Sequence, residues 1–211
     1  MVALFGFLIF IYSIILHEIA HGLMAERLGD PTARISKRLS LNPFSHIDPM
    51  MSVLVPFMLI LSGSPIIFGS AKPVPIDPYN LKNPRKDMGL IGLAGPATNF
   101  LTAIFLSLAA RLIMPLTSSN FILDVLSYGA QINIILGVFN LIPIPPLDGG
   151  RVMVAILPDK YSNVLASIEN FGIFILLFLL FFPTRIFPLQ SIIVNISSFL
   201  FGLIFPLPKL I

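Results

Sequence analysis

The 211-residue chain contains no cysteine and few charged residues. Without cysteine it can form neither a disulfide framework nor a thiolate metal site, so any metal must be held by histidine and carboxylate side chains. Only 11% of the residues are charged, 56% are hydrophobic and the mean hydropathy is +0.94, which excludes an ordinary soluble domain. No basic tract is long enough to bind nucleic acid. We expect an all-α polytopic membrane protein embedded in the lipid bilayer of the cell membrane.

Five apolar windows are long enough to cross a hydrocarbon layer of about 30 Å, which takes about 20 helical residues. They cover residues 2–27, 88–114, 122–142, 163–182 and 187–206. A sixth apolar stretch, residues 50–69, contains two prolines and favours a broken or re-entrant element. We expect five to six transmembrane helices in a single domain over residues 1–211. Its core is residues 1–157, and residues 158–211 add two C-terminal helices.

Positively charged residues flank the stretch 50–69 on both sides. They are Arg27, Arg34, Lys37, Arg38, Lys72, Lys82, Arg85 and Lys86. Cytoplasmic loops carry an excess of lysine and arginine, so we expect both loops on the cytoplasmic side and the stretch to re-enter rather than cross. Six spans remain the alternative. Polar and apolar residues alternate around 34–41, which favours a short β-hairpin after the first helix. No basic region precedes the first window, so no cleavable signal peptide is expected.

His17 and His21 lie four residues apart inside the otherwise apolar first window. Residues i and i+4 share one face of a helix, so both imidazoles can bind one metal ion. Glu18 follows the first histidine and can reach a water on that metal, which makes it the candidate general base. An ionisable group at mid-membrane depth costs about 2.5–3.5 kcal/mol, so such groups are usually retained for function. This arrangement predicts one catalytic Zn²⁺ ion, although the sequence does not exclude another divalent ion.

A catalytic zinc typically has three protein ligands, so one more must come from another segment. Asp148 is a good candidate because it follows the window 122–142, at the end where three prolines interrupt the helix. Gly149 and Gly150 allow the backbone to approach a ligand or a neighbouring helix closely. With the stretch 50–69 re-entrant, both histidines and Asp148 lie at one level, toward the cytoplasmic side.

Two motifs together resemble the site-2 proteases, a family of intramembrane zinc metalloproteases. Those proteins pair H-E-x-x-H on one transmembrane helix with N-x-x-P-x-P-x-x-D-G on a later one, and here the second motif runs from Asn140 to Gly149. A third family element, G-P-x-x-N, is present from Gly95 to Asn99, and residues 39–49 and 71–75 are similar to short bacterial members. The resemblance covers roughly residues 8 to 155.

This resemblance implies a zinc ion with Asp148 as its third ligand. It also implies hydrolysis of peptide bonds in or near transmembrane segments of membrane-protein substrates, which is regulated intramembrane proteolysis. Many relatives carry a PDZ or CBS module, and we expect neither here. The sequence identifies neither the substrate nor the oligomeric state.

Three further polar residues are candidates for binding substrate. Asn99 and Asn140 could form hydrogen bonds with the substrate backbone or the developing oxyanion, although hydrogen bonding between helices competes for Asn99. For His46, in a loop, a structural hydrogen bond is an equal alternative. A helical substrate must unwind before attack, and the segment 34–41 could bind the unwound strand by β-addition.

A metal-binding membrane protein without proteolysis, such as a transporter, is the alternative function. A pure binding site needs no base beside its first ligand, so Glu18 argues against it. A transporter would also carry acidic or histidine residues on several spans leading away from the site.

Overall fold

The computed structural model describes residues 2–63, 69, 71–116, 120–181 and 188–205 of the chain. Those residues form helices and loops without a β-strand. The elements are α1 (Val2–Leu28), α2 (Thr32–Ile35), η1 (Pro43–His46), η2 (Pro49–Leu54), α3 (Val55–Leu61), η3 (Pro78–Asn80), α4 (Pro84–Ile113), η4 (Met114–Leu116), α5 (Asn120–Asn140), α6 (Asp148–Ile156), α7 (Asp159–Ser167), α8 (Glu169–Phe181) and α9 (Leu189–Ile204).

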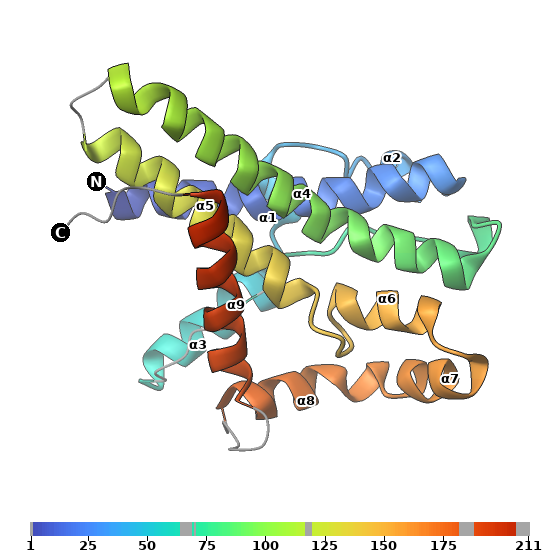
Figure 1. Ribbon diagram of the computed structural model, residues 1–211. Coiled ribbons are helices and arrows are strands. Elements are labelled where there is room, and N and C mark those ends of the chain that lie inside the picture. Colours follow the sequence, from blue (N-terminus) through green and yellow to red (C-terminus); the bar gives the residue numbers. More distant parts are fainter. Residues whose placement is uncertain (1, 64–68, 70, 117–119, 182–187, 206–211) are drawn as a thin grey trace.

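Three long helices form the centre of the molecule. Helix α4 packs against both α1 and α5, and the shorter helix α6 packs against the first half of α4 (Figure 1). Buried aliphatic side chains of α4, α5 and α9 form the main core, as Ala103, Ile134 and Ile193 illustrate. Many large apolar side chains on the outer faces are exposed, among them Phe105 and Phe199, as expected where helices face lipid rather than water. The exposed apolar surface of these helices is therefore typical of a membrane protein.

The expected five to six spans are not confirmed within the described residues. Three helical stretches are long and apolar enough to cross a membrane: Leu4–Leu28, Pro84–Leu116 and Asn120–Asn140. A fourth span results only if α7 and α8, which are bent by 82° relative to each other, count as one. Helix α9 has 16 residues and is about 24 Å long, shorter than the hydrocarbon layer. Hydropathy averaged over a window depends only on composition, so it does not reveal such a bend. Parts of the windows 163–182 and 187–206 also lie outside the described residues.

The predicted β-hairpin is wrong. Residues Thr32–Ile35 form the short helix α2, and Pro43–His46 form the 3-10 helix η1. Helical hydrogen bonds explain the difference, because the amide of Ser36 donates to the Thr32 carbonyl oxygen at 2.9 Å. The amide of Thr32 donates to Asp30 Oδ1 at 3.0 Å, which stabilises the first turn. The alternation of polar and apolar residues therefore does not mark a strand here.

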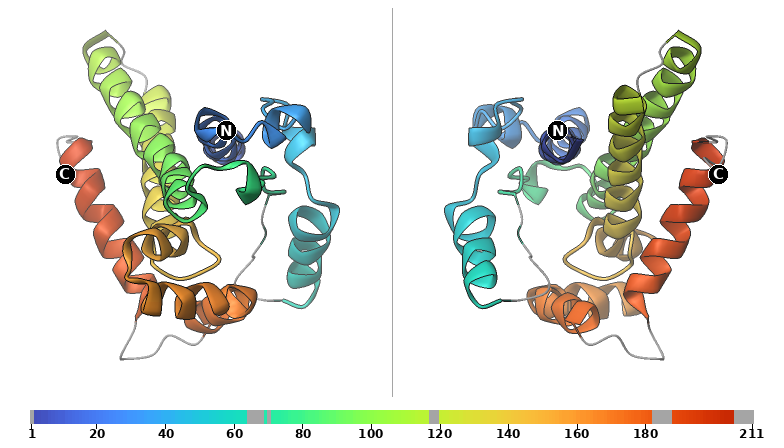
Figure 2. Two further views of the ribbon diagram at one scale, coloured as in Figure 1. Left: turned by 90° about the vertical axis from the view of Figure 1, so that its right-hand side faces the viewer. Right: turned by 90° about the vertical axis from the view of Figure 1, so that its left-hand side faces the viewer.

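The segment after these turns forms a short apolar helix, Pro49–Leu61, that lies apart from the long helices (Figure 2). The carboxylate of Asp48 caps its first turn by accepting from the amides of Met50 and Met51. The helix is about 20 Å long and cannot cross a hydrocarbon layer of about 30 Å. Residues 64–68, at the end of the predicted re-entrant stretch, lie outside the described residues.

Asp30 joins the end of α1 to the loop that leads into α4. Its side chain is fully buried and accepts from the amide of Asp77 at 2.8 Å and from Asn80 Nδ2 at 2.9 Å. Burial raises the pKa of Asp30, but these bonds and those from Thr32 outweigh it and hold the pKa below its usual range. The ionised carboxylate therefore stabilises the fold.

We expect Asp30→Asn to lower the free energy of unfolding by about 1–3 kcal/mol, because buried donors lose a charged acceptor. Since the folded pKa is depressed, this stabilisation is present above about pH 4 and is lost as the pH falls further. Thermal unfolding in detergent micelles between pH 3 and 7 measures both effects. Asp159→Asn, at an exposed ion pair, is the control and should change little. An equal pH dependence in wild type and Asp30→Asn would contradict this account.

Candidate metal centre

The two histidines of α1 point toward one place. His17 and His21 are buried on the same helix face, and their Nε2 atoms lie 3.0 Å apart. The rings are nearly perpendicular, with an interplanar angle of 87°. This arrangement follows from the spacing of four residues, which stacks two side chains one turn apart.

Asp148, the first residue of α6, brings a carboxylate to the same place. Its Oδ2 atom lies 3.0 Å from His17 Nε2 and 3.3 Å from His21 Nε2. The chain turns sharply between α5 and α6, and Gly149 makes this turn feasible because a Cβ there would lie 2.3 Å from the Leu141 carbonyl oxygen. The predicted convergence of these three side chains is thus seen in the fold.

The hydrogen bonds of the two rings decide which nitrogens remain for a metal. His17 Nδ1 donates to Asn99 Oδ1 at 2.6 Å, and His21 Nδ1 donates to the Ile91 carbonyl oxygen at 2.7 Å. Because both partners are acceptors, the proton of each neutral ring lies on Nδ1. Both Nε2 atoms then carry a free lone pair directed at the other ring and at Asp148.

Three acceptor atoms that face one another at 3.0–3.3 Å repel one another unless a positive charge lies close to them, and a metal ion would supply that charge. Asp148 Oδ2 is buried and has no hydrogen-bond partner among the described residues. Zinc–ligand bonds of about 2.0–2.1 Å in a tetrahedral site place neighbouring ligand atoms about 3.3–3.4 Å apart, close to the observed spacing. His17, His21 and Asp148 therefore fit a zinc ion, and they form the one such cluster found in the described part of the chain.

A chain of buried amides connects His17 to two further helices. Asn99 Nδ2 on α4 donates to Asn133 Oδ1 on α5 at 3.1 Å, and Asn133 Nδ2 donates to Ser13 Oγ on α1 at 2.8 Å. Both polar ends of Asn99 are thus engaged within the protein. Substrate binding by Asn99 stays a prediction, and the geometry favours its alternative role between helices.

We expect Asn99→Leu to weaken zinc binding about 10–100-fold, because loss of the partner of a ligand's second nitrogen has effects of this size. Competition with a chromophoric chelator measures the affinity in purified protein. Thr102→Val, one turn further along α4 at a hydroxyl that bonds only its own helix, is the matched control. Unchanged affinity in Asn99→Leu would show that Asn99 does not orient His17.

Gly95 on α4 gives the two rings their space. A Cβ atom at this position would lie 2.5 Å from His17 Cε1 and 2.5 Å from His21 Nε2. The sequence pointed to this glycine only through the G-P-x-x-N element, because the contact itself joins residues more than 70 positions apart.

The carboxylate of Glu18 lies outside the three-atom cluster and has a different partner. Its Oε2 atom accepts a hydrogen bond from the backbone amide of Val74 at 2.9 Å. Sequence reasoning did not find this contact, since a backbone donor leaves no side-chain pattern.

Asn140 and His46 are engaged in local hydrogen bonds. Asn140 Nδ2 donates to the Leu136 carbonyl oxygen of its own helix at 3.0 Å. His46 is buried, with Nε2 2.7 Å from the Ser40 carbonyl oxygen, and its own carbonyl oxygen accepts from the amide of Lys72. Their roles in substrate binding stay predictions.

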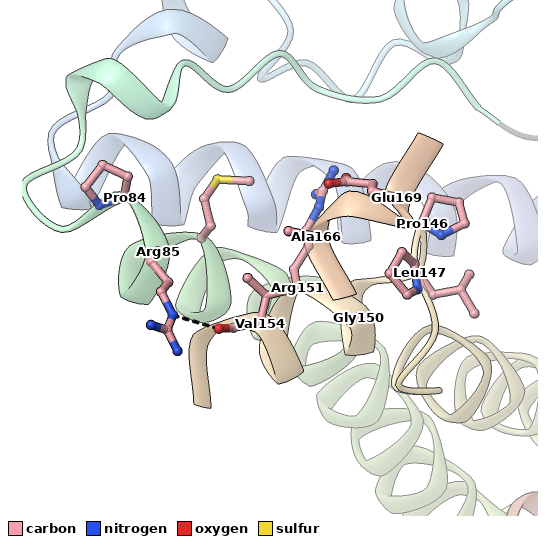
Figure 3. Close-up of a pocket in the computed structure, with 11 residues that line it drawn as sticks. Pro84, Arg85, Pro146, Leu147, Gly150, Arg151, Val154, Ala166 and Glu169 are labelled. Atoms are coloured by element: carbon pink, nitrogen blue, oxygen red, sulfur yellow. Dashed lines mark hydrogen bonds between the residues drawn. The ribbon is translucent and has the colours of Figure 1, made fainter. Parts of the chain in front are cut away.

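A cavity of about 250 Å³ adjoins α6 (Figure 3). Its walls come from the start of α4, from the loop before α6, from α6 itself and from the junction of α7 and α8. Within this lining, Arg85 Nε donates to the Val154 carbonyl oxygen. Leu147, Gly150 and Arg151 line it, whereas the two histidines and Asp148 do not. The cavity therefore lies next to the cluster rather than around it.

Comparisons with known proteins identify similar sequences. The sequence model described as Peptidase family M50 matches residues 114–183, a range that contains Asp148. YwhC of Bacillus subtilis strain 168 is 33% identical over 179 residues, which cover 82% of this chain and 78% of YwhC. Rip2 of Mycobacterium tuberculosis strain H37Rv is 31% identical over 82% of this chain and 64% of Rip2. MJ0392 of Methanocaldococcus jannaschii is 26% identical over 92% of this chain and 47% of MJ0392.

YwhC and Rip2 are named as candidate zinc metalloproteases, and MJ0392 is named as a zinc metalloprotease. No solved structure matches the fold significantly. The match to YwhC extends over most of both proteins and the M50 match covers the segment that supplies Asp148. The chain therefore belongs to peptidase family M50, the site-2 protease family that its motifs resemble.

Proposed function

We propose that the chain is an intramembrane zinc metalloendopeptidase that hydrolyses peptide bonds in or near transmembrane segments of membrane-protein substrates. Membership of a peptidase family makes the chain a hydrolase, and zinc is the metal in the names of its relatives. The observation that carries the proposal is the buried cluster of His17, His21 and Asp148, with Glu18 one residue from the first ligand. The metal-binding core is residues 1–157.

In the proposed reaction the two histidines and Asp148 would hold a zinc ion, which would supply Lewis acidity toward the scissile carbonyl group. Glu18 accepts a proton from the attacking water and later passes it to the leaving amine. Asn99 and the Ile91 carbonyl oxygen hold the two imidazole rings through their Nδ1 atoms, which fixes the direction of the Nε2 lone pairs. The two histidines therefore need little rearrangement to bind a metal ion.

We further propose that the active site faces the cytoplasmic side. Helix α1 ends and α4 begins at the same end of the molecule (Figure 1). Arg27 lies in the last turn of α1, and Lys82, Arg85 and Lys86 lie at or just before the start of α4. The intervening helix Pro49–Leu61 is too short to cross, which supports the re-entrant arrangement. The histidines lie in the half of α1 nearest this basic end.

Removal of the metal tests the proposal. A chelator should abolish cleavage of a single-span reporter protein in liposomes, and added Zn²⁺ should restore it, because Glu18 alone would lack the Lewis acid that the reaction needs. The three histidines of the chain provide a matched comparison of zinc content. His17→Gln and His21→Gln should lose the zinc, whereas His46→Gln should retain it. Cleavage that survives complete zinc removal would exclude this mechanism.

A further inference from the structure

An extended segment of the loop between α3 and α4 lies against the proposed general base. Residues 71–76, which we term the strap, have no helical or strand structure. The amide of Val74 donates to Glu18 Oε2 at 2.9 Å. Pro73 and Pro75 flank Val74 and lack an amide hydrogen, so this donor is isolated along the strap. The strap thus contributes a single backbone donor to the Glu18 carboxylate.

A buried arginine anchors the strap at the two residues that precede Val74. Arg38 Nη2 donates to the Lys72 carbonyl oxygen at 2.7 Å and, more weakly, to the Pro73 carbonyl oxygen at 3.4 Å. Only 8% of Arg38 is exposed, and no acidic side chain pairs with it among the described residues. Burying a cation without an acidic partner is unfavourable unless its donors bind carbonyl oxygens. The amide of Lys72 adds a second anchor by donating to the His46 carbonyl oxygen at 2.9 Å.

The helix that carries Glu18 has a gap into which the strap fits. Gly22 follows His21, and a Cβ atom there would lie 3.0 Å from Val74 Cγ1 and 2.6 Å from Leu39 Cδ2. The side chain of Val74 is buried in this gap. Close contact between α1 and the strap therefore depends on the absence of a side chain at Gly22.

We propose that Arg38 is a positioning residue that acts through the strap to orient the Glu18 carboxylate. The inference rests on the proposed function of Glu18 as general base. The Val74 amide fixes Oε2, which leaves Oε1 to accept the proton from water. Because a misplacement of about 1 Å can reduce a rate about 100-fold, an anchor of this kind affects turnover even though Arg38 does not touch the substrate.

Hydrogen exchange followed by mass spectrometry tests the contact between Glu18 and Val74, and it does not depend on the peptidase activity of the protein itself. The strap contains two prolines, which have no amide hydrogen, so peptides that cover it report on few amides. The amide of Val74, between Pro73 and Pro75, is one of these few. Exchange at Val74 should become at least about tenfold faster in Glu18→Ala and in Arg38→Met, because a protecting hydrogen bond is lost. Arg34→Met is the matched control, since Arg34 forms an exposed ion pair with Glu26. Wild-type exchange at Val74 in Glu18→Ala would overturn the proposal.

Kinetics of zinc-loaded protein test the positioning role. Arg38→Met should lower kcat about 10–100-fold with little change in KM and with one zinc per chain, whereas Arg38→Lys should recover part of the loss by binding one carbonyl oxygen. In Glu18→Asp, whose shorter side chain does not reach the strap, adding Arg38→Met should reduce kcat much less than in wild type. Equal reductions in both backgrounds would show that Arg38 serves stability alone and would overturn the proposal.

Gly22→Ala provides a second variant, because its added methyl group would push against the Val74 side chain and displace the strap from α1. It decides the question if Arg38→Met does not fold. Its kcat should fall with retention of zinc, and unchanged kcat with faster Val74 exchange would contradict the proposal. Failure of wild type to cleave any reporter would refute the proposed function instead, while the exchange measurement would still report on the contact between Glu18 and Val74.

Discussion

Glu18→Gln is expected to bind a full equivalent of zinc and to lose about 10²–10⁴-fold in kcat, the range for removal of a general base. Glutamine keeps the size of the side chain and an oxygen that accepts from the Val74 amide, so the strap contact at 2.9 Å should persist. What it loses is the ability to take a proton from water. Because Glu18 does not belong to the three-atom cluster, the metal ligands themselves are unchanged.

Elemental analysis of the purified variant and cleavage of a single-span reporter in liposomes measure the two quantities separately. Glu26→Gln is the matched control, because Glu26 lies on the same helix in an exposed ion pair with Arg34. It should retain both zinc and activity, since exposed ion pairs contribute little. Zinc-loaded Glu18→Gln with wild-type turnover would remove Glu18 from the mechanism, and loss of zinc would assign it a role in metal binding. Full zinc without turnover would disfavour a transporter, for which the carboxylate has no evident use.

The convergence of His17, His21 and Asp148 could be predicted from the sequence because two of the three side chains are related by local geometry and the third stands in a distinctive turn. The spacing of His17 and His21 fixes their common face through helix periodicity alone. Asp148 was identified from the prolines and glycines around it, which mark a sharp turn where backbone segments approach closely. The three residues of the cluster could be found because imidazole and carboxylate side chains are typical metal ligands and are rare in an apolar sequence.

Other features depend on contacts that leave no such pattern. The bend of 82° between α7 and α8 is not visible in hydropathy, and α2 forms where alternation favoured a strand because Asp30 binds the amide of its first residue. The strap is the clearest case, since a backbone amide 56 residues from Glu18 donates the bond. Sequence reasoning is thus most reliable for side-chain chemistry at helical spacing, and least reliable where backbone groups from distant segments meet.

Gly95→Ala is expected to lose zinc, and with it all cleavage, although alanine is the better helix former. In the interior of an exposed helix this substitution would stabilise by about 0.5–1 kcal/mol. Here the added methyl group would lie 2.5 Å from His21 Nε2 and 2.6 Å from His17 Nε2, the two nitrogen atoms proposed to bind the metal. No real Cβ contact is this short, so one ring or helix must move.

Neither ring can move freely, because each is held through its Nδ1 atom, by Asn99 and by the Ile91 carbonyl oxygen. Both acceptors are on α4, the helix that carries Gly95, so a shift of α4 away from α1 breaks the bonds that orient the ligands. We expect zinc affinity to fall by more than about 100-fold, beyond the usual effect of losing one such bond. Competition with a chromophoric chelator, together with the reporter assay, measures the loss.

Gly202→Ala on α9 is the matched control, because a Cβ atom there has open space around it. It should bind zinc normally and unfold at an equal or slightly higher temperature, as helix propensity predicts. The two substitutions make the same chemical change, and only Gly95 faces the ligand rings. Normal zinc binding by Gly95→Ala would mean that the rings occupy other positions when the metal is bound. A loss confined to Gly95→Ala would instead establish that α4 holds the two histidines from both sides, through the hydrogen bonds at Nδ1 and the close approach at Nε2.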